Sequence, residues 1–112
     1  MAHSKKDEFK KEEIEIAKIA KALSHPARIR ILHILIELDI CMCGDIVEHL
    51  PLSQSTVSQH LKELKNSGLI KGSINPPKVC YCINKETFKN SSELINSFLK
   101  SSSKKLNRKK EC

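Results

Sequence analysis

Apolar residues recur at helical spacing through most of this 112-residue chain, and two shorter runs near its middle have a strand-like pattern. The helical pattern predicts four helices and one short helical turn. Their expected ranges are 12–23, 26–38, 46–50, 54–67 and 85–99. In the second helix, four apolar side chains are expected to face the core, namely Ile29, Leu32, Leu35 and Ile36.

Residues at the ends of these segments support the boundaries. Ser24 is predicted to cap the second helix, with Pro26 in its first turn. Ser53 is predicted to cap the helix that follows it, and Gly68 suits the position just after the last turn of that helix. Asn84 is predicted to cap the last helix.

Two strand-like runs, residues 69–74 and 79–83, flank a turn at residues 75–78, where two prolines cannot lie inside a central strand. A further extended segment is expected at residues 40–43. The order is therefore helix, helix, short strand, helix, turn, helix, β-hairpin, helix. This order predicts a mainly α domain with a small β-hairpin, a winged helix-turn-helix, over residues 12–99.

The net charge of +7 is unevenly distributed along the chain. Residues 100–112 hold six basic residues and one acidic residue, and we expect them to form a basic disordered tail. Residues 1–11 are expected to be a flexible N-terminus. Residues 53–78 hold four lysines and one glutamate, and this local excess favours a surface that faces phosphate groups.

The cellular setting is predicted from hydropathy and cysteine content. No apolar run is long enough to cross a bilayer, and the charged N-terminus lacks the apolar stretch of a signal peptide. We therefore expect a cytoplasmic protein with no membrane partner, in a compartment where thiols stay reduced. Five cysteines in that setting indicate metal or redox chemistry rather than a disulfide framework, with the terminal Cys112 expected to be incidental.

The helix expected over residues 54–67 has one apolar face, formed by Val57, Leu61 and Leu64, and one face of short polar side chains. A solvated helix face is usually richer in Glu and Lys. Hydroxyl and amide groups can bond base edges, and a helix fits the major groove, so double-stranded operator DNA is the expected partner. The residues expected to contact DNA are Gln54, Ser55, Thr56, Ser58, Gln59, His60, Lys62 and, from the hairpin turn, Lys78. Of these, His60 is expected to be half-buried, either in packing or in a phosphate contact.

Two stretches of the chain resemble a known family. HPARIRILHIL and ICMCGDIVEHLPLSQSTVSQHLKELKNSGLIKG are similar to the ArsR/SmtB family of metal- and metalloid-responsive repressors, most of all its arsenic-responsive members. The resemblance runs from about residue 23 to residue 83, and STVSQHLKEL followed by GLI is its most specific part. It implies a DNA-binding homodimer, held together by the first and last helices, that represses transcription until an inducer binds.

Four of the cysteines form two Cys-x-Cys pairs, and residues two apart on a strand share one face. In a winged helix-turn-helix, the extended segment before the helix-turn-helix pairs with the second strand of the hairpin. The topology therefore predicts that the two pairs lie on neighbouring strands, and if both pairs share one face, three or four thiolates lie within reach of one ion. The expected metal ligands are Cys41, Cys43, Cys80 and Cys82.

The orientation of the hairpin cysteines depends on strand alternation. If Val79, Tyr81 and Ile83 pack inward, the two cysteines between them lie on the outer face. The alternative is that the cysteines act only as small apolar packing residues.

Thiolates select soft ions, and trivalent arsenic or antimony suits a site of three thiolates. The resemblance implies the same chemistry, because the arsenic and cadmium sensors of this family carry a Cys-x-Cys that matches Cys41 and Cys43. The third cysteine of the arsenic sensors corresponds to Ile46 here, so Cys80 or Cys82 would have to replace it. As(III) or Sb(III) is the expected inducer, and a divalent soft metal such as Cd(II), Pb(II) or Zn(II) is the alternative. The last helix has no histidine, which argues against the zinc and nickel type of site in this family.

Other interpretations of the cysteines stay open. A thiol redox switch would answer oxidants or persulfides by forming a disulfide or sulfur bridge. A structural zinc clip would have no sensing role. An enzyme is not indicated, because the chain has no Cys-x-x-Cys in a βαβ setting, no Gly-rich phosphate loop and no carboxylate pair in a catalytic arrangement.

Overall fold

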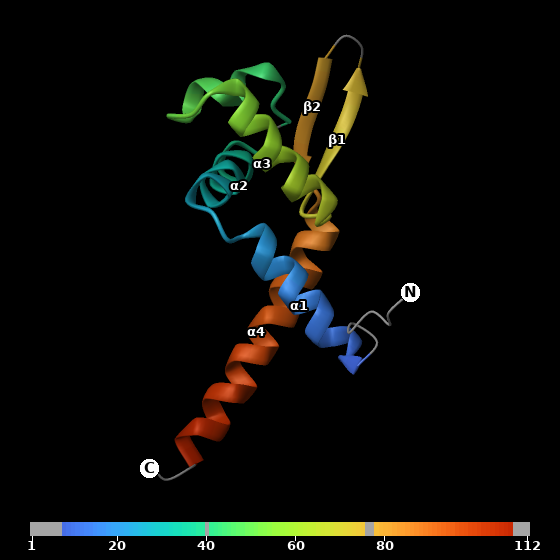
Figure 1. Ribbon diagram of the computed structural model, residues 1–112, viewed down its shortest axis with the longest axis vertical. Coiled ribbons are helices and arrows are strands. Elements are labelled where there is room, and N and C mark those ends of the chain that lie inside the picture. The colour runs from blue at the N-terminus through green and yellow to red at the C-terminus, as the bar shows by residue number, and fades with distance from the viewer. Residues whose placement is uncertain (1–7, 40, 76–77, 109–112) are drawn as a thin grey trace.

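The computed structural model describes residues 8–39, 41–75 and 78–108, and at residues 73–75 and 78 it describes the backbone. Its elements are the helices α1 (Lys11–Ala22) and α2 (Pro26–Leu38), a short 3₁₀ helix η2 (Gly44–His49), helix α3 (Gln54–Asn66), strands β1 (Ile70–Asn75) and β2 (Lys78–Ile83), and helix α4 (Lys85–Arg108). Figure 1 shows α2, α3 and the hairpin gathered at one end of the molecule, while α1 packs against α4 and α4 extends away from them. This is the predicted winged helix-turn-helix.

The core lies where α2, η2, α3 and the base of the hairpin meet. Its most deeply buried side chains are Ile31, Leu35, Ile46, Val57, Leu64, Leu69 and Ile70. The first two come from α2, the next from η2 and two more from α3, so the core joins the elements of the helix-turn-helix to β1. The position of α3 against the hairpin is therefore fixed by apolar packing.

The prediction for the buried face of α2 was partly wrong. Leu32 and Leu35 are buried as expected and Ile29 is half-buried, but Ile36 is 44% exposed. Ile31 has no exposed surface and takes the central position. At 100° per residue, Ile36 lies well to one side of the Ile31 and Leu35 stripe, where it lines an open pocket with Ile83 of β2 and Phe88 of α4.

His25, and not Ser24, caps α2. The His25 Nδ1 atom accepts a hydrogen bond from the Ala27 backbone N–H at 3.0 Å, while Ser24 donates its hydroxyl to the Lys21 carbonyl at 2.7 Å. Pro26 lies in the first turn of α2, as predicted. Ser24 therefore satisfies a carbonyl at the end of α1, and the next residue, His25, caps α2.

The other predicted capping residues, Ser53, Asn84 and Gly68, are confirmed. The Ser53 hydroxyl accepts from the Thr56 N–H at the start of α3, and the Asn84 side-chain oxygen accepts from the Thr87 N–H at the start of α4. Gly68 follows α3 with φ of 86°, a left-handed conformation that glycine adopts without steric cost.

Helix α4 extends beyond its predicted end at Leu99 and reaches Arg108. Its second half contains no Gly or Pro, and Lys105 and Arg108 lie in the last turn, where positive charge is favourable to the helix dipole. The segment expected to be a disordered tail is thus helical up to Arg108. Cys112 and the predicted turn prolines, Pro76 and Pro77, lie outside the described residues.

Within the part of the chain that the structure describes, no helix combines the length and the apolar character needed to cross a membrane.

Candidate functional site: a cysteine cluster beside a DNA-reading helix

The segment that leads into η2 pairs with β2, as the topology predicted. The Met42 N–H donates to the Tyr81 carbonyl at 2.9 Å, and the Tyr81 N–H donates to the Met42 carbonyl at 2.7 Å, which makes an antiparallel bridge. The Met42 side chain is only 2% exposed and belongs to the core. Because side chains alternate along an extended segment, the residues on either side of Met42 face the opposite way.

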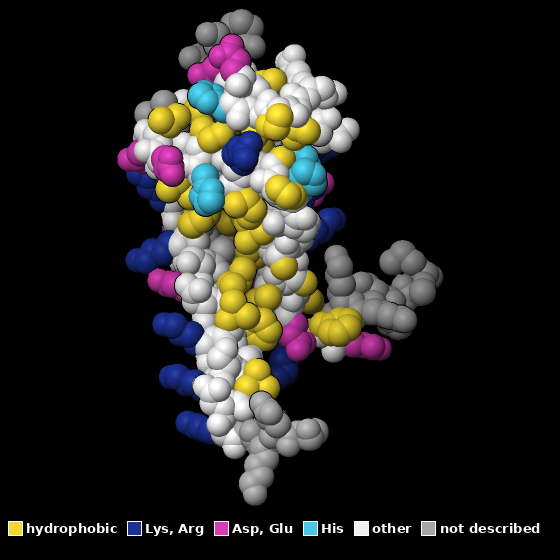
Figure 2. Space-filling view, turned by 90° about the vertical axis from the view of Figure 1, so that its left-hand side faces the viewer, with side chains coloured by type: hydrophobic (Ala, Val, Ile, Leu, Met, Phe, Trp, Pro, Cys, Tyr) yellow, Lys and Arg dark blue, Asp and Glu magenta, His cyan; other side chains and the backbone are white. Residues whose placement is uncertain are grey.

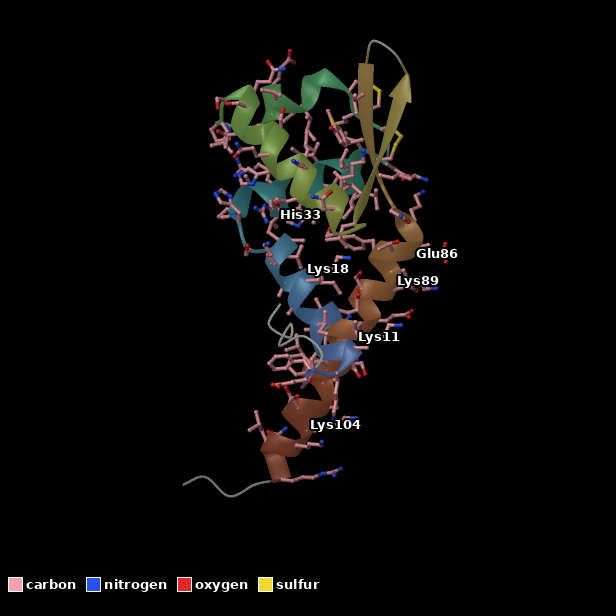
Figure 3. The ribbon with its side chains drawn as sticks, turned by 45° about the vertical axis from the view of Figure 1, so that its right-hand side comes forward. Lys11, Lys18, His33, Glu86, Lys89 and Lys104 are labelled. Carbon is pink, nitrogen blue, oxygen red and sulfur yellow. A yellow bond between two sulfur atoms is a disulfide. The ribbon has the colours of Figure 1, made fainter. Side chains whose placement is uncertain are left out.

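This bridge sets the two Cys-x-Cys pairs directly opposite each other. The Cα atoms of Cys41 and Cys82 are 4.4 Å apart, and those of Cys43 and Cys80 are 4.0 Å apart. Positions that flank a hydrogen-bonded pair in an antiparallel ladder are the ones whose side chains come closest. Each opposed pair is joined as a disulfide, and Figure 3 shows the two S–S bonds one above the other beside the hairpin.

The disulfides correspond to the redox alternative, whereas the metal site requires free thiolates. In this bonded form, no group of three or more His, Cys, Asp or Glu side chains within the described ranges is arranged to hold a metal ion. The structure therefore brings Cys41, Cys43, Cys80 and Cys82 together, on one face and in two bonded pairs.

The residues that alternate with the hairpin cysteines face the core, with one exception. Tyr81 and Ile83 are half-buried and pack against the core cluster. Val79 was predicted to pack inward, but it is 42% exposed. It lies toward the hairpin tip, beyond the reach of the helices that cover the base of the hairpin.

Ile46, which matches the third cysteine of the arsenic sensors, is a core residue. It is 1% exposed and packs with α2 and α3 residues inside the helix-turn-helix. A side chain at this position therefore lies in the core.

The polar face of α3 is exposed, as predicted. Val57, Leu61 and Leu64 are buried against α2 and β1, while Thr56 is half-buried, with its hydroxyl 3.0 Å from that of Ser53. The exposed residues among the predicted DNA contacts are Gln54, Ser55, Ser58, Gln59 and Lys62. For Lys78 the structure describes the backbone and not the side chain.

The structure corrects the prediction for His60. Of the two expected roles, packing and a phosphate contact, the side chain takes up packing, and at 8% exposure it is buried more deeply than the expected half-burial. Its Nδ1 accepts a hydrogen bond from Arg28 Nε at 3.1 Å, and its ring lies against that of His25 with centroids 4.3 Å apart. Burial lowers the pKa of His60 below its ordinary value of 6.5, and His25 and Arg28 lower it further by charge repulsion.

Arg28 is not among the residues predicted from the sequence, yet it connects three helices. Besides its bond to His60 on α3, its Nη1 donates to the Lys21 carbonyl at the end of α1, at 3.0 Å. A contact between residues 32 positions apart leaves no periodic pattern in the sequence, so only the fold reveals it.

A second surface lies on the long helix. None of the residues of α4 is buried, and Phe98, Leu99 and Leu106 are 46%, 53% and 70% exposed. Figure 2 shows hydrophobic side chains in a line down the helical part of the molecule, with Lys and Arg side chains along one edge. An apolar pocket between α1 and α4 continues this line, with Ile19, Leu23, Phe88 and Ile95 among its lining residues.

Comparisons with known proteins agree with this geometry. The family model described as "Bacterial regulatory protein, arsR family" matches residues 25–71. The chain is 39% identical over 72 residues to the arsenical resistance operon repressor of Staphylococcus xylosus. The aligned region is 64% of this chain and 68% of that protein. It is 36% identical over 87 residues to the CadC homolog of Staphylococcus aureus, a cadmium resistance transcriptional regulatory protein, covering 77% of this chain and 71% of that one.

Solved structures have the same fold. The transcriptional repressor BigR from Xylella fastidiosa superposes with a TM-score of 0.59 at 26% identity, covering 86% of this chain and 97% of that one. An ArsR family transcriptional regulator superposes with a TM-score of 0.71 over 98% of this chain and 100% of that chain, and at 17% identity it is evidence for the fold alone. Family membership follows from the fold, the exposed polar face of α3 and the identities to the two staphylococcal proteins. This chain belongs to the arsR family of bacterial regulatory proteins, which are DNA-binding transcriptional regulators and not enzymes, and which bind operator DNA as dimers.

Proposed function

We propose that this chain is a homodimeric repressor that leaves its operator when trivalent arsenic or antimony binds the thiolates of Cys41, Cys43, Cys80 and Cys82. The main support is the bridge between Met42 and Tyr81, because it sets the two cysteine pairs opposite each other on one face, where Cys41 is exposed and the other three are half-buried. The similarity to proteins named for arsenical and cadmium resistance supports a soft-ion inducer.

The donor set fits such an ion once the disulfides are reduced. Opposed cysteines have Cα atoms 4.0–4.4 Å apart, and successive cysteines on one strand are about 7 Å apart along the strand. Side chains from both strands can therefore converge on one point above this face. All four donors are sulfur, and soft thiolate ligands favour soft ions over the hard cations that oxygen ligands hold.

The position of the cysteines gives a route from ion to DNA. Cys41 and Cys43 lie immediately before η2, which leads into α3, while Cys80 and Cys82 lie in the wing. An ion held by both segments would fix the wing against the segment that leads into the helix-turn-helix. Paired DNA-reading helices must match major grooves about 34 Å apart, so a small change in their placement weakens binding. A hundredfold loss of affinity requires about 2.7 kcal/mol of coupling.

The DNA contacts in this proposal come from the polar face of α3 and from the wing. Gln54, Ser55, Thr56, Ser58 and Gln59 would meet base edges and nearby phosphates. Lys62 and Lys78 would bind phosphates. The proposal leaves His60 out of this set, because its side chain is buried.

The proposal is tested by fluorescence anisotropy of operator DNA with the fully reduced protein, titrated with arsenite, antimonite and Cd(II). Serine at all four cysteines is expected to leave DNA binding intact and to abolish release by arsenite. Cys112→Ser is the matched control and should still be released. Release of the fourfold serine variant by arsenite would rule out the site.

A second candidate function uses the same cysteines as a dithiol–disulfide switch, and the two disulfides of the structure favour it. Each pair would lose two electrons and two protons to an oxidant such as a peroxide or a persulfide, forming one S–S bond. DNA affinity of the reduced and the oxidised protein, measured without metal, decides this candidate. Equal affinities of the reduced and oxidised protein would exclude the redox switch. They would leave the arsenic proposal standing, because its titration uses only the reduced protein.

A further inference from the structure

A polar pocket opens beside one of the two disulfides. Its volume is about 400 Å³, within the range of about 300–1,000 Å³ that is usual for small-molecule sites. Cys41 and Cys82 are part of its wall, together with Lys71 from β1 and Lys85 from α4. The other disulfide, between Cys43 and Cys80, does not line this pocket.

The strand register explains why the two disulfides have different surroundings. Lys71 is the β1 partner of Cys82, and Cys82 is bonded to Cys41, so the three residues form one row across β1, β2 and the extended segment before η2. Directly opposed side chains in such a row have Cβ atoms about 5 Å apart. The β1 partner of Cys80 in the other row is Ser73, which carries no charge.

Both signs of charge surround the pocket. Lys85 Nζ lies 3.1 Å from a carboxylate oxygen of Asp39, and both side chains are well exposed, at 78% and 72%. Glu86 adds a second carboxylate, and Figure 3 shows it near the start of α4, close to the hairpin. The first turn of α4 also has backbone N–H groups without acceptors inside the helix, which suits a carboxylate.

We propose that this pocket docks a small thiol built on an α-amino acid, and that such a thiol opens the Cys41–Cys82 disulfide in preference to Cys43–Cys80. A ligand with one ammonium group and one or two carboxylates complements a lining of two lysines and two acids. This inference rests on the proposed function, in which the state of the cysteines controls DNA binding. It adds the entry point and the chemical class of the reductant.

The reaction proceeds in two exchanges. The ligand thiolate attacks Sγ of Cys41, because Cys41 is exposed whereas Cys82 is half-buried. The protein S–S bond breaks, and Cys82 leaves as a thiolate beside the ammonium group of Lys71. A second ligand thiolate then attacks the ligand sulfur of the mixed disulfide and releases the Cys41 thiolate. Two ligand thiols are oxidised to one ligand disulfide, and the protein disulfide takes up their two electrons.

The test uses the full chain in its oxidised form, with glutathione as the zwitterionic thiol and 2-mercaptoethanol as the uncharged one. Timed alkylation followed by peptide mass mapping gives the opening rate of each disulfide. Glutathione is expected to open Cys41–Cys82 first, and the variant Lys71→Gln/Lys85→Gln should slow that step about three- to tenfold, as expected for a few exposed charge pairs. The rate with 2-mercaptoethanol should fall less, because that thiol loses only the help that Lys71 gives to the leaving Cys82 thiolate and has no charges for the lysines to dock. Lys104→Gln is the control, because it also removes a lysine charge but lies on α4 far from the hairpin. It should leave the glutathione rate unchanged.

Three results would overturn the inference. Glutathione could open Cys43–Cys80 first, or the double variant could keep the wild-type glutathione rate. An equal slowing with both thiols would mean that the lysines act only on the leaving sulfur and dock nothing. No DNA is present in this assay, whereas the arsenite titration uses reduced protein, so failure of one proposal is distinguishable from failure of the other.

Discussion

His60 lies on the DNA-reading helix but faces the protein. It accepts a hydrogen bond from Arg28 through Nδ1, and Arg28 also binds the last turn of α1. The unprotonated ring is required for this contact, because a protonated Nδ1 cannot accept from a guanidinium N–H. The protonated ring would also face two basic side chains, His25 and Arg28, at close range. The contact therefore depends on a neutral His60.

Stability is predicted to fall as the pH drops below about 6.5, because the pKa of His60 is lowered in the folded state. Below that pH the unfolded chain takes up a proton that the folded chain resists, which favours unfolding until the pH falls below the folded pKa. His60→Gln keeps an acceptor for Arg28 without a titrating group, so its loss of stability between pH 7 and pH 5 should be smaller. Thermal unfolding across this range measures the difference.

The matched control for this prediction is His33→Gln, since His33 is an exposed histidine on α2 and is labelled in Figure 3. This variant should lose as much stability on acidification as the wild type. If His60→Gln has the same pH profile as the wild type, the Arg28–His60 contact is not what titrates.

At the scale of the elements, local sequence patterns were enough to locate most of the fold. The apolar spacing of α3, its Ser53 cap and Gly68 after its last turn predicted that helix almost to the residue. Where packing decides between two apolar neighbours, pattern alone was insufficient, as with Ile31 and Ile36 in α2. Alternation predicted that the two members of each Cys-x-Cys pair share a face, but it left open whether both pairs share the same face, which the structure shows. Alternation does not determine whether they are bonded, because that depends on their redox state and on the close approach at the Met42–Tyr81 bridge.

Two substitutions on α3 should separate base reading from phosphate binding. Gln59→Ala is expected to reduce discrimination between operator and random DNA, by about 1–3 kcal/mol where the amide reads a base. Lys62→Gln should instead weaken binding to all sequences alike. It should also lower the slope of log affinity against log salt by about 0.9 for each lost phosphate contact, or roughly 2 in a dimer.

Anisotropy titrations at several salt concentrations, with operator and random duplexes, measure both effects. Lys104→Gln removes the same charge far from α3 and should leave both the slope and the discrimination unchanged. If Gln59→Ala weakens both duplexes equally, its side chain reads no base.

For the molecule as a whole, the exposed apolar side of α4 is the feature that a single chain leaves unexplained. A 24-residue helix without one buried side chain gains little stability from its own subunit, and most helices depend on packing of an apolar face. Phe98, Leu99 and Leu106 point to a partner surface, and α1 packs against the same helix, where Ile19 and Leu23 line a pocket with Phe88 and Ile95. The family binds DNA as a dimer, and we propose that α1 and α4 form the dimer contact of this chain.

Leu99→Glu is predicted to separate the subunits. Each dimer would bury two unpaired carboxylates, and an uncompensated buried charge costs about 3–5 kcal/mol, so the dimer should dissociate at micromolar concentration. Operator affinity should fall with it, because a monomer offers one DNA-reading helix instead of two. Since Leu99 is 53% exposed within the subunit, its helical content and fold should be retained, which circular dichroism can verify. Ser97→Glu introduces the same charge on the opposite side of α4 and should remain dimeric in sedimentation velocity. A Leu99→Glu protein that sediments as a dimer and binds operator normally would place the dimer contact elsewhere.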